Sequence, residues 1–206
     1  MEAIKGSLAL DAMGGDMGPL EVVEGLKIAF LNGAGKFTDD PILLVGREDE
    51  LRSALRTVGI QDDRRVKVIH ADEVIGMDEK PMHALKKKKG SSMLVALDLV
   101  KSGDAKAILS CGNTGSLMGG GTIKLRPLDG IERPALATII PSLKQPFVLL
   151  DAGANPESTP SQLMHNAILG SNFSRAVLGI TQPRIGLLTI GTEEGKGGER
   201  IQETHR

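Results

Sequence analysis

Four short segments of this sequence combine glycine with small polar residues, and each follows a short apolar run. They are residues 11–19 (DAMGGDMGP), 111–115 (CGNTG), 151–155 (DAGAN) and 190–198 (IGTEEGKGG). Glycine lets a backbone approach a ligand closely, and its N–H groups can surround an anion. Neutral hydrogen-bonding side chains and one lysine accompany the glycines. Such a set of groups suits the binding of phosphate and of a developing oxyanion.

A single segment of this kind is weak evidence, because a glycine-rich turn can also simply connect a strand to a helix. Four of them together favour a ligand site. The residues predicted to act in catalysis are Asp16, Asn113 and Lys196. The residues predicted to bind substrate or phosphate are Asp11, Gly14, Gly15, Gly112, Thr114, Gly115, Asp151, Asn155, Glu193, Gly195 and Gly197.

The two common nucleotide-binding motifs do not fit these glycines. Residues 14–18 lack the G-x-G-x-x-G spacing of a dinucleotide site, and the second apolar run ends in Val45-Gly46-Arg47 without a carboxylate for a ribose. The 191–197 loop is one residue shorter than a P-loop, and Gly197 stands where a Mg²⁺-binding Ser or Thr is required. The sequence therefore supports neither NAD nor ATP as a ligand.

The elements that must position these loops are short apolar runs, which alternate with longer segments of helical periodicity. Predicted strands cover residues 7–11, 42–45, 66–70, 107–110 and 184–189, and predicted helices cover 20–31, 48–58, 91–101, 116–125 and 162–178. This alternation predicts an α/β fold with a mostly parallel sheet between two layers of helices. Loops that follow parallel strands lie at one edge of the sheet, so we expect the four segments to converge on one cleft.

Residues 135–140 and 147–150 depart from this alternation, because only a short turn separates these two apolar runs. Such spacing suits a hairpin, and residues 131–150 are a candidate antiparallel arm. We expect residues 1–206 to form a single α/β domain. The last predicted helix begins at Glu199 and ends with the chain after two turns, which suggests a truncated C-terminus.

Composition excludes several classes of protein. Of the 206 residues, 40% are hydrophobic and 25% are charged, as in a globular protein, and the net charge of −1 gives no general attraction to nucleic acid. No stretch approaches the roughly 18 apolar residues of a transmembrane helix. The single cysteine, Cys111, cannot form an internal disulfide or a cysteine-based metal cluster. We expect a soluble cytoplasmic protein that does not bind nucleic acid.

Residues 8–16 (LALDAMGGD) resemble the opening signature of the PlsX family of phosphate acyltransferases. The resemblance continues, in family order, at 70–81 (HADEVIGMDEKP), 91–100 (SSMLVALDLV), 112–115 (GNTG), 130–137 (GIERPALA), 151–155 (DAGAN) and 184–197 (RIGLLTIGTEEGKG). These blocks span nearly the whole chain, and several are highly specific.

The resemblance implies a homodimer with a three-layer α/β/α fold related to isocitrate dehydrogenases and phosphate acetyltransferases. It implies that long-chain acyl carrier protein reacts with inorganic phosphate to give acyl phosphate for phospholipid synthesis, without a metal or organic cofactor. The family associates peripherally with membrane, through segments that usually lie beyond residue 206. Two departures stand out: Pro156-Glu157-Ser158 replaces the usual Val-Asp-Cys, and a later Asp-Gly-Phe-x-Gly-Asn block is absent.

A thioester is already activated, so phosphate can attack it directly while the protein positions the reactants and stabilises the oxyanion. In this hypothesis Asn113 and Thr114 orient phosphate or the thioester carbonyl, and Asp11 or Asp16 holds Lys196 or a loop amide in place. The predicted phosphate ligands are the side chain of Lys196 and the amides of Gly14, Gly15, Gly195 and Gly197.

Other interpretations of single residues stay open. Asp11 and Asp151 can serve only to accept hydrogen bonds from turn amides. Cys111 can be an acyl-accepting nucleophile, although a small buried thiol is the commoner case. His70 and His165 are candidate bases, and a helical His165 can equally face solvent or fill a surface groove.

Two other functions stay open as well. The chain can be a phosphate acyltransferase that acts on coenzyme A esters. It can also be a non-catalytic binding domain or an inactive truncated product. Residues 86–89 (KKKK) are either a solvated face or a docking surface for an acidic carrier protein.

Overall fold

The computed structural model of the protein describes residues 6–32, 41–153, 155, 157–191, 193 and 196–206. The chain divides into two compact units, residues 1–126 and 127–206. The first unit holds the parallel sheet, and the second holds a long helix beside a small two-stranded sheet. The expectation of one α/β domain over residues 1–206 stays a prediction.

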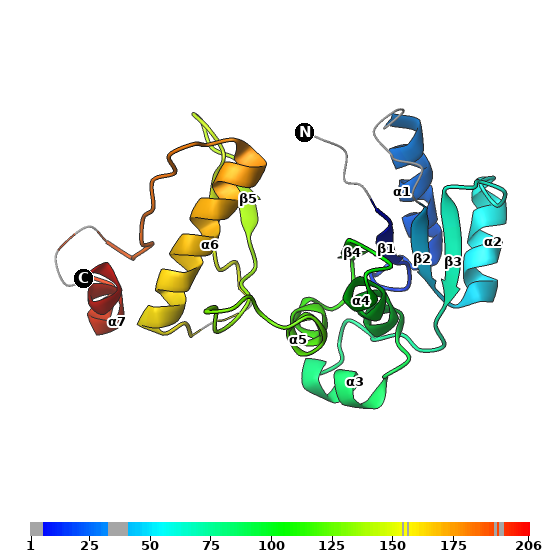
Figure 1. The fold of residues 1–206 in the computed structure, drawn as a ribbon, viewed down its shortest axis with the longest axis horizontal. Helices are drawn as coiled ribbons and strands as arrows, with labels where there is room; N and C mark the ends of the chain where they lie inside the picture. The colour runs from blue at the N-terminus through cyan, green and yellow to red at the C-terminus, as the bar shows by residue number, and fades with distance from the viewer. Residues whose placement is uncertain (1–5, 33–40, 154, 156, 192, 194–195) are drawn as a thin grey trace. The chain divides into compact units, whose positions relative to one another are not determined.

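A four-stranded parallel sheet forms the centre of the first unit (Figure 1). Its strands are β1 (Leu8–Asp11), β2 (Ile42–Gly46), β3 (Val66–His70) and β4 (Ala107–Ser110), in the order β3-β2-β1-β4. The last residue of β1, Asp11, lies opposite Val45 of β2 and Ser110 of β4. The four strands predicted in this part of the sequence are confirmed, and all of them pair in parallel.

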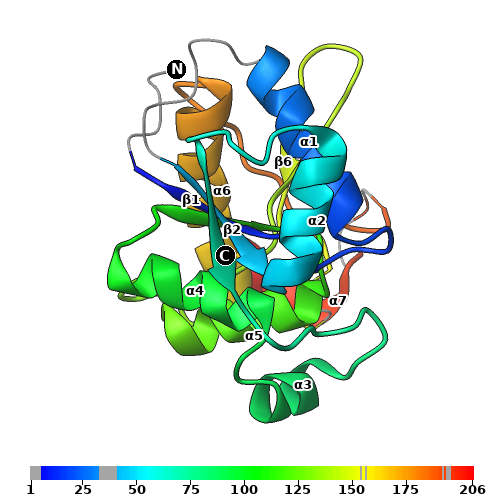
Figure 2. The same cartoon turned by 90° about the vertical axis from the view of Figure 1, so that its right-hand side faces the viewer.

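Helices cover both faces of this sheet (Figure 2). Those that pack on the sheet are α1 (Pro19–Asn32), α2 (Glu48–Val58) and α4 (Ser92–Ser102). The first unit also contains α3 (Pro81–Lys87) and α5 (Thr114–Lys124), which pack against each other, and α5 packs on α4 as well. Helices α1 and α2 share a buried cluster with Leu10 and Leu44 on one face, and α4 packs against Ala9 and Val45 on the other. Successive side chains of a strand point to opposite faces, so each strand contributes to both clusters. The predicted α/β fold, with a mostly parallel sheet between helices, is confirmed.

Helix α3 was not predicted from the sequence, because its seven residues end in lysines and are too few to show a clear period. Its first residue is Pro81, whose ring fixes a helical φ and whose missing N–H is not needed in the first turn. Leu85 is buried against α5, where Gly119 and Gly120 leave room for its methyl groups. Tertiary packing therefore completes a helix that is too short to be stable alone.

The described part of the second unit contains a two-stranded antiparallel sheet and two helices. Its elements are β5 (Thr138–Ile140), β6 (Phe147–Leu149), α6 (Pro160–Leu178) and α7 (Gly198–His205). Helix α6 begins with a capping box, in which Thr159 Oγ1 accepts from the N–H of Gln162 and the Gln162 side chain accepts from the N–H of Thr159. Neither α6 nor any other helix of the described residues is long and apolar enough to cross a membrane. An arm-like role for residues 131–150 stays a prediction.

The strand predicted at residues 184–189 is wrong. Residues 183–189 have no regular secondary structure, and Leu188 and Ile190 are 82% and 91% exposed. The apolar composition suits a strand, but a strand is held by hydrogen bonds to a neighbour. None of the described residues pairs with this segment in a sheet.

Candidate functional site

The glycine-rich loops that follow β1 and β4 contact each other. The two strands are parallel neighbours, so both loops leave the same edge of the sheet. A Cβ atom added to Gly14 would lie 2.7 Å from the backbone nitrogen of Gly112, and one added to Gly15 would lie 3.3 Å from the Cβ of Cys111. Only glycine at position 14 permits this approach. The structure thus brings together Asp11, Gly14, Gly15 and Gly112, four of the predicted site residues.

Asp11 holds the two loops in this arrangement. The residue is 1% exposed. Its Oδ1 accepts a hydrogen bond from the N–H of Met13 (3.2 Å), and its Oδ2 accepts one from Ser110 Oγ (2.7 Å). Ser110 Oγ in turn accepts from the N–H of Gly112 (3.1 Å). A continuous chain of hydrogen bonds links the loops, and Asp11 is an acceptor for a loop amide.

Asn113 uses its side-chain amide within the protein. It is the N-cap of α5, and its Oδ1 accepts from the N–H of Ser116 (2.9 Å). Its Nδ2 donates to the carbonyls of Met77 (2.8 Å) and Glu79 (3.1 Å). Donation to a substrate would therefore require the release of one of these carbonyls, and that role stays a prediction. The role as N-cap could have been predicted, because this asparagine stands directly before a helical segment in the sequence.

The start of α5 adds positive potential to this edge of the sheet. The first turn of a helix has N–H groups without helical partners and carries a partial positive charge. Thr114 opens α5 and is exposed, directly after the loop that contacts Gly14. Gly115 packs tightly, because a Cβ there would lie 2.6 Å from Cγ of Pro81. Glycine-rich backbone and the start of a helix thus lie together at one place, an arrangement that favours an anion.

An apolar groove of about 490 Å³ borders the loop after β1. Val22 and Leu26 of α1 line it together with Leu109, which is exposed on β4, one of the two edge strands of the sheet that the described residues form. Asp16 is exposed and also lines this groove. Cys111 lines it too and is exposed, so the interpretation of a buried thiol is wrong. The cysteine follows the edge strand, on a side that no further described strand covers.

The loop that contacts the start of α5 is held by an ion pair. Glu79 Oε1 accepts from the N–H of Gly76 (2.7 Å) and pairs with Lys88, whose Nζ also donates to the carbonyl of Val74 (2.7 Å). Lys88 is thus engaged within the protein, while the other lysines of residues 86–89 are exposed. Docking of an acidic carrier protein on this run stays a prediction, and it rests on those exposed lysines.

This ion pair makes the stability of the first unit depend on pH. The hydrogen bond from Lys88 holds the pKa of Glu79 below its ordinary value of 4.5. The stabilisation by the carboxylate is therefore complete above about pH 4.5, and it is lost as the pH falls through the lower pKa of the folded state. We expect Glu79→Gln to lower the midpoint of thermal unfolding at neutral pH, and its difference from the wild-type protein to shrink in acid.

Far-ultraviolet circular dichroism measures this midpoint. Glu24→Gln is the matched control, because Glu24 is an exposed acid on α1 of the same unit. Its unfolding midpoint should follow that of the wild-type protein at every pH. A difference between Glu79→Gln and the wild type that is the same in acid as at neutral pH would contradict the role of the ion pair.

Asp151 and Asn155 fasten the 151–155 loop to the segment that precedes β5. Asp151 Oδ1 accepts from the N–H of Leu136 (3.0 Å), and Oδ2 accepts from the backbone N–H and from Nδ2 of Asn155 (2.7 Å each). Asn155 Nδ2 also donates to the carbonyl of Pro134 (3.1 Å). These contacts agree with the interpretation of Asp151 as an acceptor for turn amides. A direct role in substrate binding stays a prediction for both residues.

Lys196 and Glu193 are exposed in the loop before α7. Lys196 Nζ lies 4.0 Å from Glu193 Oε1, and the two side chains are 47% and 68% exposed. Gly197 is the N-cap of α7 with a φ of 86°, a conformation that favours glycine. Gly195, another predicted phosphate ligand, lies outside the described residues. The ammonium group of Lys196 is therefore open to solvent and to an anion.

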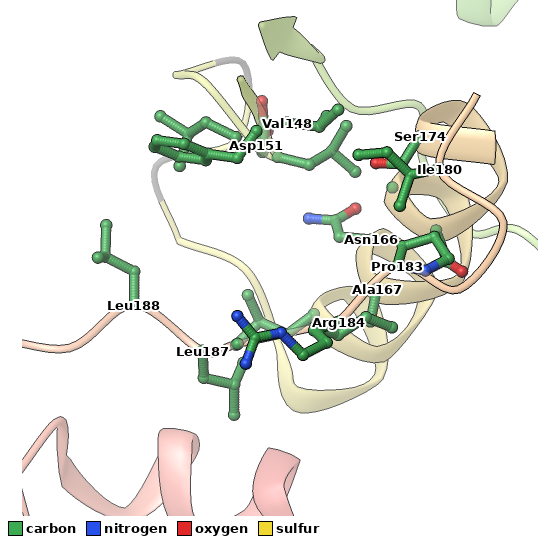
Figure 3. Close-up of a pocket in the computed structure, with 18 of the residues that line it drawn as sticks. Val148, Asp151, Asn166, Ala167, Ser174, Ile180, Pro183, Arg184, Leu187 and Leu188 are labelled. Atoms are coloured by element: carbon green, nitrogen blue, oxygen red, sulfur yellow. The ribbon is translucent and has the colours of Figure 1, made fainter. Parts of the chain in front are cut away.

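A cavity of about 670 Å³ lies in the second unit, between α6, β6 and residues 180–188 (Figure 3). Asp151 and Asn155 line it. Several polar residues of this cavity were not predicted from the sequence, and two of them bear side chains that could bind a ligand strongly. They are Asn166, which is 7% exposed on α6, and Arg184. A polar residue on the buried face of a helical pattern is the signal that would have indicated Asn166.

The two histidines considered as bases have other surroundings. His70 Nδ1 accepts from the N–H of Glu48 at the start of α2 (3.3 Å), and its Nε2 lies 2.7 Å from Asp72 Oδ1. His165 Nδ1 is buried and has no hydrogen-bond partner among the described residues.

Within the described residues, no group of three or more His, Cys, Asp or Glu side chains is placed to hold a metal ion.

The four predicted loops are divided equally between the units. The loops after β1 and β4 contact each other in the first unit, and the loops at 151–155 and 190–198 belong to the second. The expectation that all four form one cleft concerns both units together, and it stays a prediction.

Comparison with known proteins gives consistent similarities. Residues 7–206 match a family described as fatty acid synthesis protein. The chain is 44% identical over 197 residues to a phosphate acyltransferase of Caldanaerobacter subterraneus subsp. tengcongensis, which covers 95% of this chain and 56% of that protein. It is also 44% identical over 198 residues to a phosphate acyltransferase of Geobacter sulfurreducens, with 96% and 56% covered. The chain therefore spans somewhat more than half the length of these curated relatives.

The fold also resembles a solved structure, EutD phosphotransacetylase from Staphylococcus aureus. The TM-score is 0.65 at 16% sequence identity, and the match covers 98% of this chain and 63% of that chain. At this level of identity the likeness concerns the fold alone.

Proposed function

The chain belongs to the family of fatty acid synthesis proteins, and we propose that it transfers a long-chain acyl group from a thioester to inorganic phosphate. In this proposal the acyl donor is the long-chain acyl thioester of acyl carrier protein. The products are acyl phosphate and the free carrier protein. The observation that carries the proposal is the match over residues 7–206, together with 44% identity to proteins named phosphate acyltransferase.

The proposed reaction needs no covalent intermediate on the protein, because a thioester is already an activated acyl group. A phosphate oxygen attacks the carbonyl carbon, and the carbonyl oxygen takes the negative charge in the tetrahedral intermediate. The C–S bond then breaks while the new C–O bond remains, and the sulfur leaves as a thiolate that takes up a proton. The protein has to position two reactants and stabilise an oxyanion, which together lower the barrier by several kcal/mol or more.

The sheet edge of the first unit supports the oxyanion part of this proposal. The N–H groups of Gly14 and Gly15, beside the start of α5, are donors of the kind that stabilise developing negative charge. Asp11 accepts hydrogen bonds from the N–H of Met13 and from Ser110 Oγ, and Ser110 Oγ accepts one from the N–H of Gly112. This chain of hydrogen bonds keeps the backbone of both loops in place, so that it does not have to reorganise during the reaction. Asp16 and Thr114 are exposed at the ends of the same loops, where substrate would meet them.

Lys196 supports the phosphate part of the proposal. Its exposed ammonium group has Glu193 as an acidic neighbour at 4.0 Å, and Gly197 follows it at the start of α7. We assign the binding of phosphate to this lysine and to the glycine N–H groups. The proposal further includes a homodimer that works in the cytoplasm, with peripheral attachment to the membrane.

A turnover assay tests the proposed function. The 206-residue chain is mixed with palmitoyl acyl carrier protein and phosphate, and the release of free thiol is recorded. We expect release that depends on phosphate, together with an acyl phosphate that hydroxylamine traps as the hydroxamate. Release that is equal without phosphate, or no release from a folded chain, would refute the proposal for this chain. Faster release from palmitoyl coenzyme A would change the acyl donor and leave the reaction type in place.

A further inference from the structure

Exposed lysines gather around α3 in the first unit. Residues 77–89 (MDEKPMHALKKKK) contain five lysines, of which Lys88 is engaged with Glu79 and with the carbonyl of Val74. Asp78 is the one other acid of this segment. The remaining lysines are exposed, and none forms an ion pair with the part of the chain that the structure describes: Lys80, Lys86, Lys87 and Lys89. Positive charge is thus concentrated here, in a chain whose net charge is −1.

Two methionines accompany these cations. Met82 of α3 is 53% exposed, and Met77, which precedes the helix, is 45% exposed. Met82 and Lys86 are four residues apart and therefore share one side of the helix, while Ala84 and Leu85 are buried. A methionine side chain is flexible and adapts to the shape of a partner. Apolar side chains with charges around them are typical of a surface that binds another protein.

The packing beneath this surface holds it in one conformation. Leu85 is buried against α5, where a Cβ atom added to Gly119 would lie 3.0 Å from Cδ1 of this leucine. The ion pair of Glu79 with Lys88 joins the residues on either side of α3. A surface that is already ordered loses little conformational entropy when it binds a partner.

The same surface borders the candidate site of the first unit. Helix α3 lies beside α5 (Figure 2). A Cβ atom added to Gly115, the second residue of α5, would lie 2.6 Å from Cγ of Pro81, the first residue of α3. Asn113, the N-cap of α5, donates to the carbonyls of Met77 and Glu79. A partner that is held on α3 is therefore placed next to the start of α5.

From this arrangement we infer that the surface of α3 docks an acidic face of acyl carrier protein. Carrier proteins are acidic, and opposite charges speed the encounter of two proteins and disfavour other partners. The inference rests on the proposed function, in which this carrier brings the acyl group. The α3 surface consists of the two methionines and the four exposed lysines, namely Met77, Lys80, Met82, Lys86, Lys87 and Lys89.

An anionic lipid surface fits α3 less well. A helix that lies in the surface of a membrane needs a broad apolar face that enters the lipid. Among the seven residues of α3, all of them described, Met82 is the one large apolar side chain that is exposed. The helix is about 10 Å long, at roughly 1.5 Å per residue. Its cations therefore cover an area suited to one helix of a partner protein.

Calorimetric titration of the 206-residue chain with apo acyl carrier protein tests this assignment. The apo form lacks the prosthetic arm, so its binding reports contacts between the two protein surfaces alone. We expect the double variant Lys86→Glu, Lys87→Glu to bind about tenfold more weakly, because attraction becomes repulsion. We expect Met82→Ala to bind about fivefold more weakly, through the loss of an apolar contact. Binding to the wild-type chain should weaken as salt is added, since salt screens exposed charges.

The control makes the same change of charge elsewhere on the first unit. Lys67 of β3 and Lys101 of α4 are exposed lysines outside the α3 surface, and the double variant Lys67→Glu, Lys101→Glu should bind as the wild-type chain does. Met82→Ala keeps the test valid if the double variant of α3 does not fold, because alanine favours a helix. Wild-type affinity in the folded variants of α3, or no binding of the carrier to the folded wild-type chain, would overturn the inference.

Vesicles of phosphatidylglycerol provide the test against lipid. The wild-type chain and the double variant of Lys86 and Lys87 are each sedimented with the vesicles, and we expect no difference between them. A double variant that no longer sediments with vesicles and yet binds the carrier as the wild-type chain does would assign the α3 surface to lipid. That result would overturn the inference.

Docking and turnover can be judged separately, because the apo carrier has no acyl group to transfer. If the carrier docks on α3 and no acyl phosphate forms in the assay, the proposed reaction fails and the inference stands. If acyl phosphate forms, we expect the double variant of Lys86 and Lys87 to have a KM for palmitoyl acyl carrier protein about tenfold above that of the wild-type chain. An unchanged KM would mean that the inference fails and the reaction stands.

Discussion

Replacement of Gly14 by alanine is expected to lower the free energy of unfolding of the first unit by about 1–3 kcal/mol. A Cβ atom at this position would lie 2.7 Å from the nitrogen and 2.8 Å from the Cα of Gly112, and 3.0 Å from Oδ2 of Asp11. These neighbours are backbone atoms and a buried carboxylate that is already hydrogen-bonded, so none of them can move aside easily. The two loops must separate, or the hydrogen bonds of Asp11 must break.

Urea unfolding followed by far-ultraviolet circular dichroism measures this loss. Gly121→Ala is the matched control, because a Cβ at that position in α5 would meet no atom within 4 Å. Alanine is favoured over glycine inside a helix by about 0.5–1 kcal/mol, so this variant should be more stable than the wild type. A Gly14→Ala protein as stable as the wild type would show that the loops move apart freely. The argument for a preformed oxyanion site would then be lost.

The centre of the sheet in the first unit could be predicted because β1 and β2 are largely buried on both faces. Residues 42–46 (ILLVG) are all buried, and such a strand appears in the sequence as a continuous apolar run. A chain that leaves a parallel strand for a helix has to turn at the carboxyl edge of the sheet. The position of the loops after β1 and β4 therefore followed from the strands alone.

A sequence pattern does not show which neighbouring strand a segment would pair with. This limits the prediction of secondary structure in the second unit. Residues 184–189 have the composition of a strand, but hydrogen bonds to a neighbour decide whether a strand forms. None of the described residues supplies that neighbour.

The side-chain contacts of Asn113 and Asn166 could not be predicted from the sequence either. Asn113 is engaged in a helix cap and with two loop carbonyls, whereas Asn166 faces a cavity without a partner among the described residues. The residue type is the same at both positions, and only the packing around each distinguishes an amide that is hydrogen-bonded within the protein from one that faces a cavity.

Lys196→Ala is expected to lower kcat/KM for phosphate by about 10²–10³-fold in the proposed acyl transfer, the usual effect of removing one donor to a developing charge. The variant removes the cation that we assign to phosphate, and the glycine N–H groups remain. Lys144→Ala is the control, because Lys144 is also an exposed lysine of the second unit and stands outside the predicted site. It should keep full activity. Full activity of Lys196→Ala would show that backbone N–H groups bind phosphate without the lysine.

The stability of Lys196→Ala decides between a phosphate ligand and a structural lysine. Lys196 and Glu193 are both exposed and their charged groups are 4.0 Å apart, and exposed ion pairs of this kind contribute about 0–1 kcal/mol. The variant should therefore unfold at nearly the same urea concentration as the wild type while its activity falls. Gly14→Ala, in contrast, should lose stability and activity together. A loss of stability in Lys196→Ala as large as that in Gly14→Ala would mean that the lysine supports the fold, and its assignment to phosphate would be withdrawn.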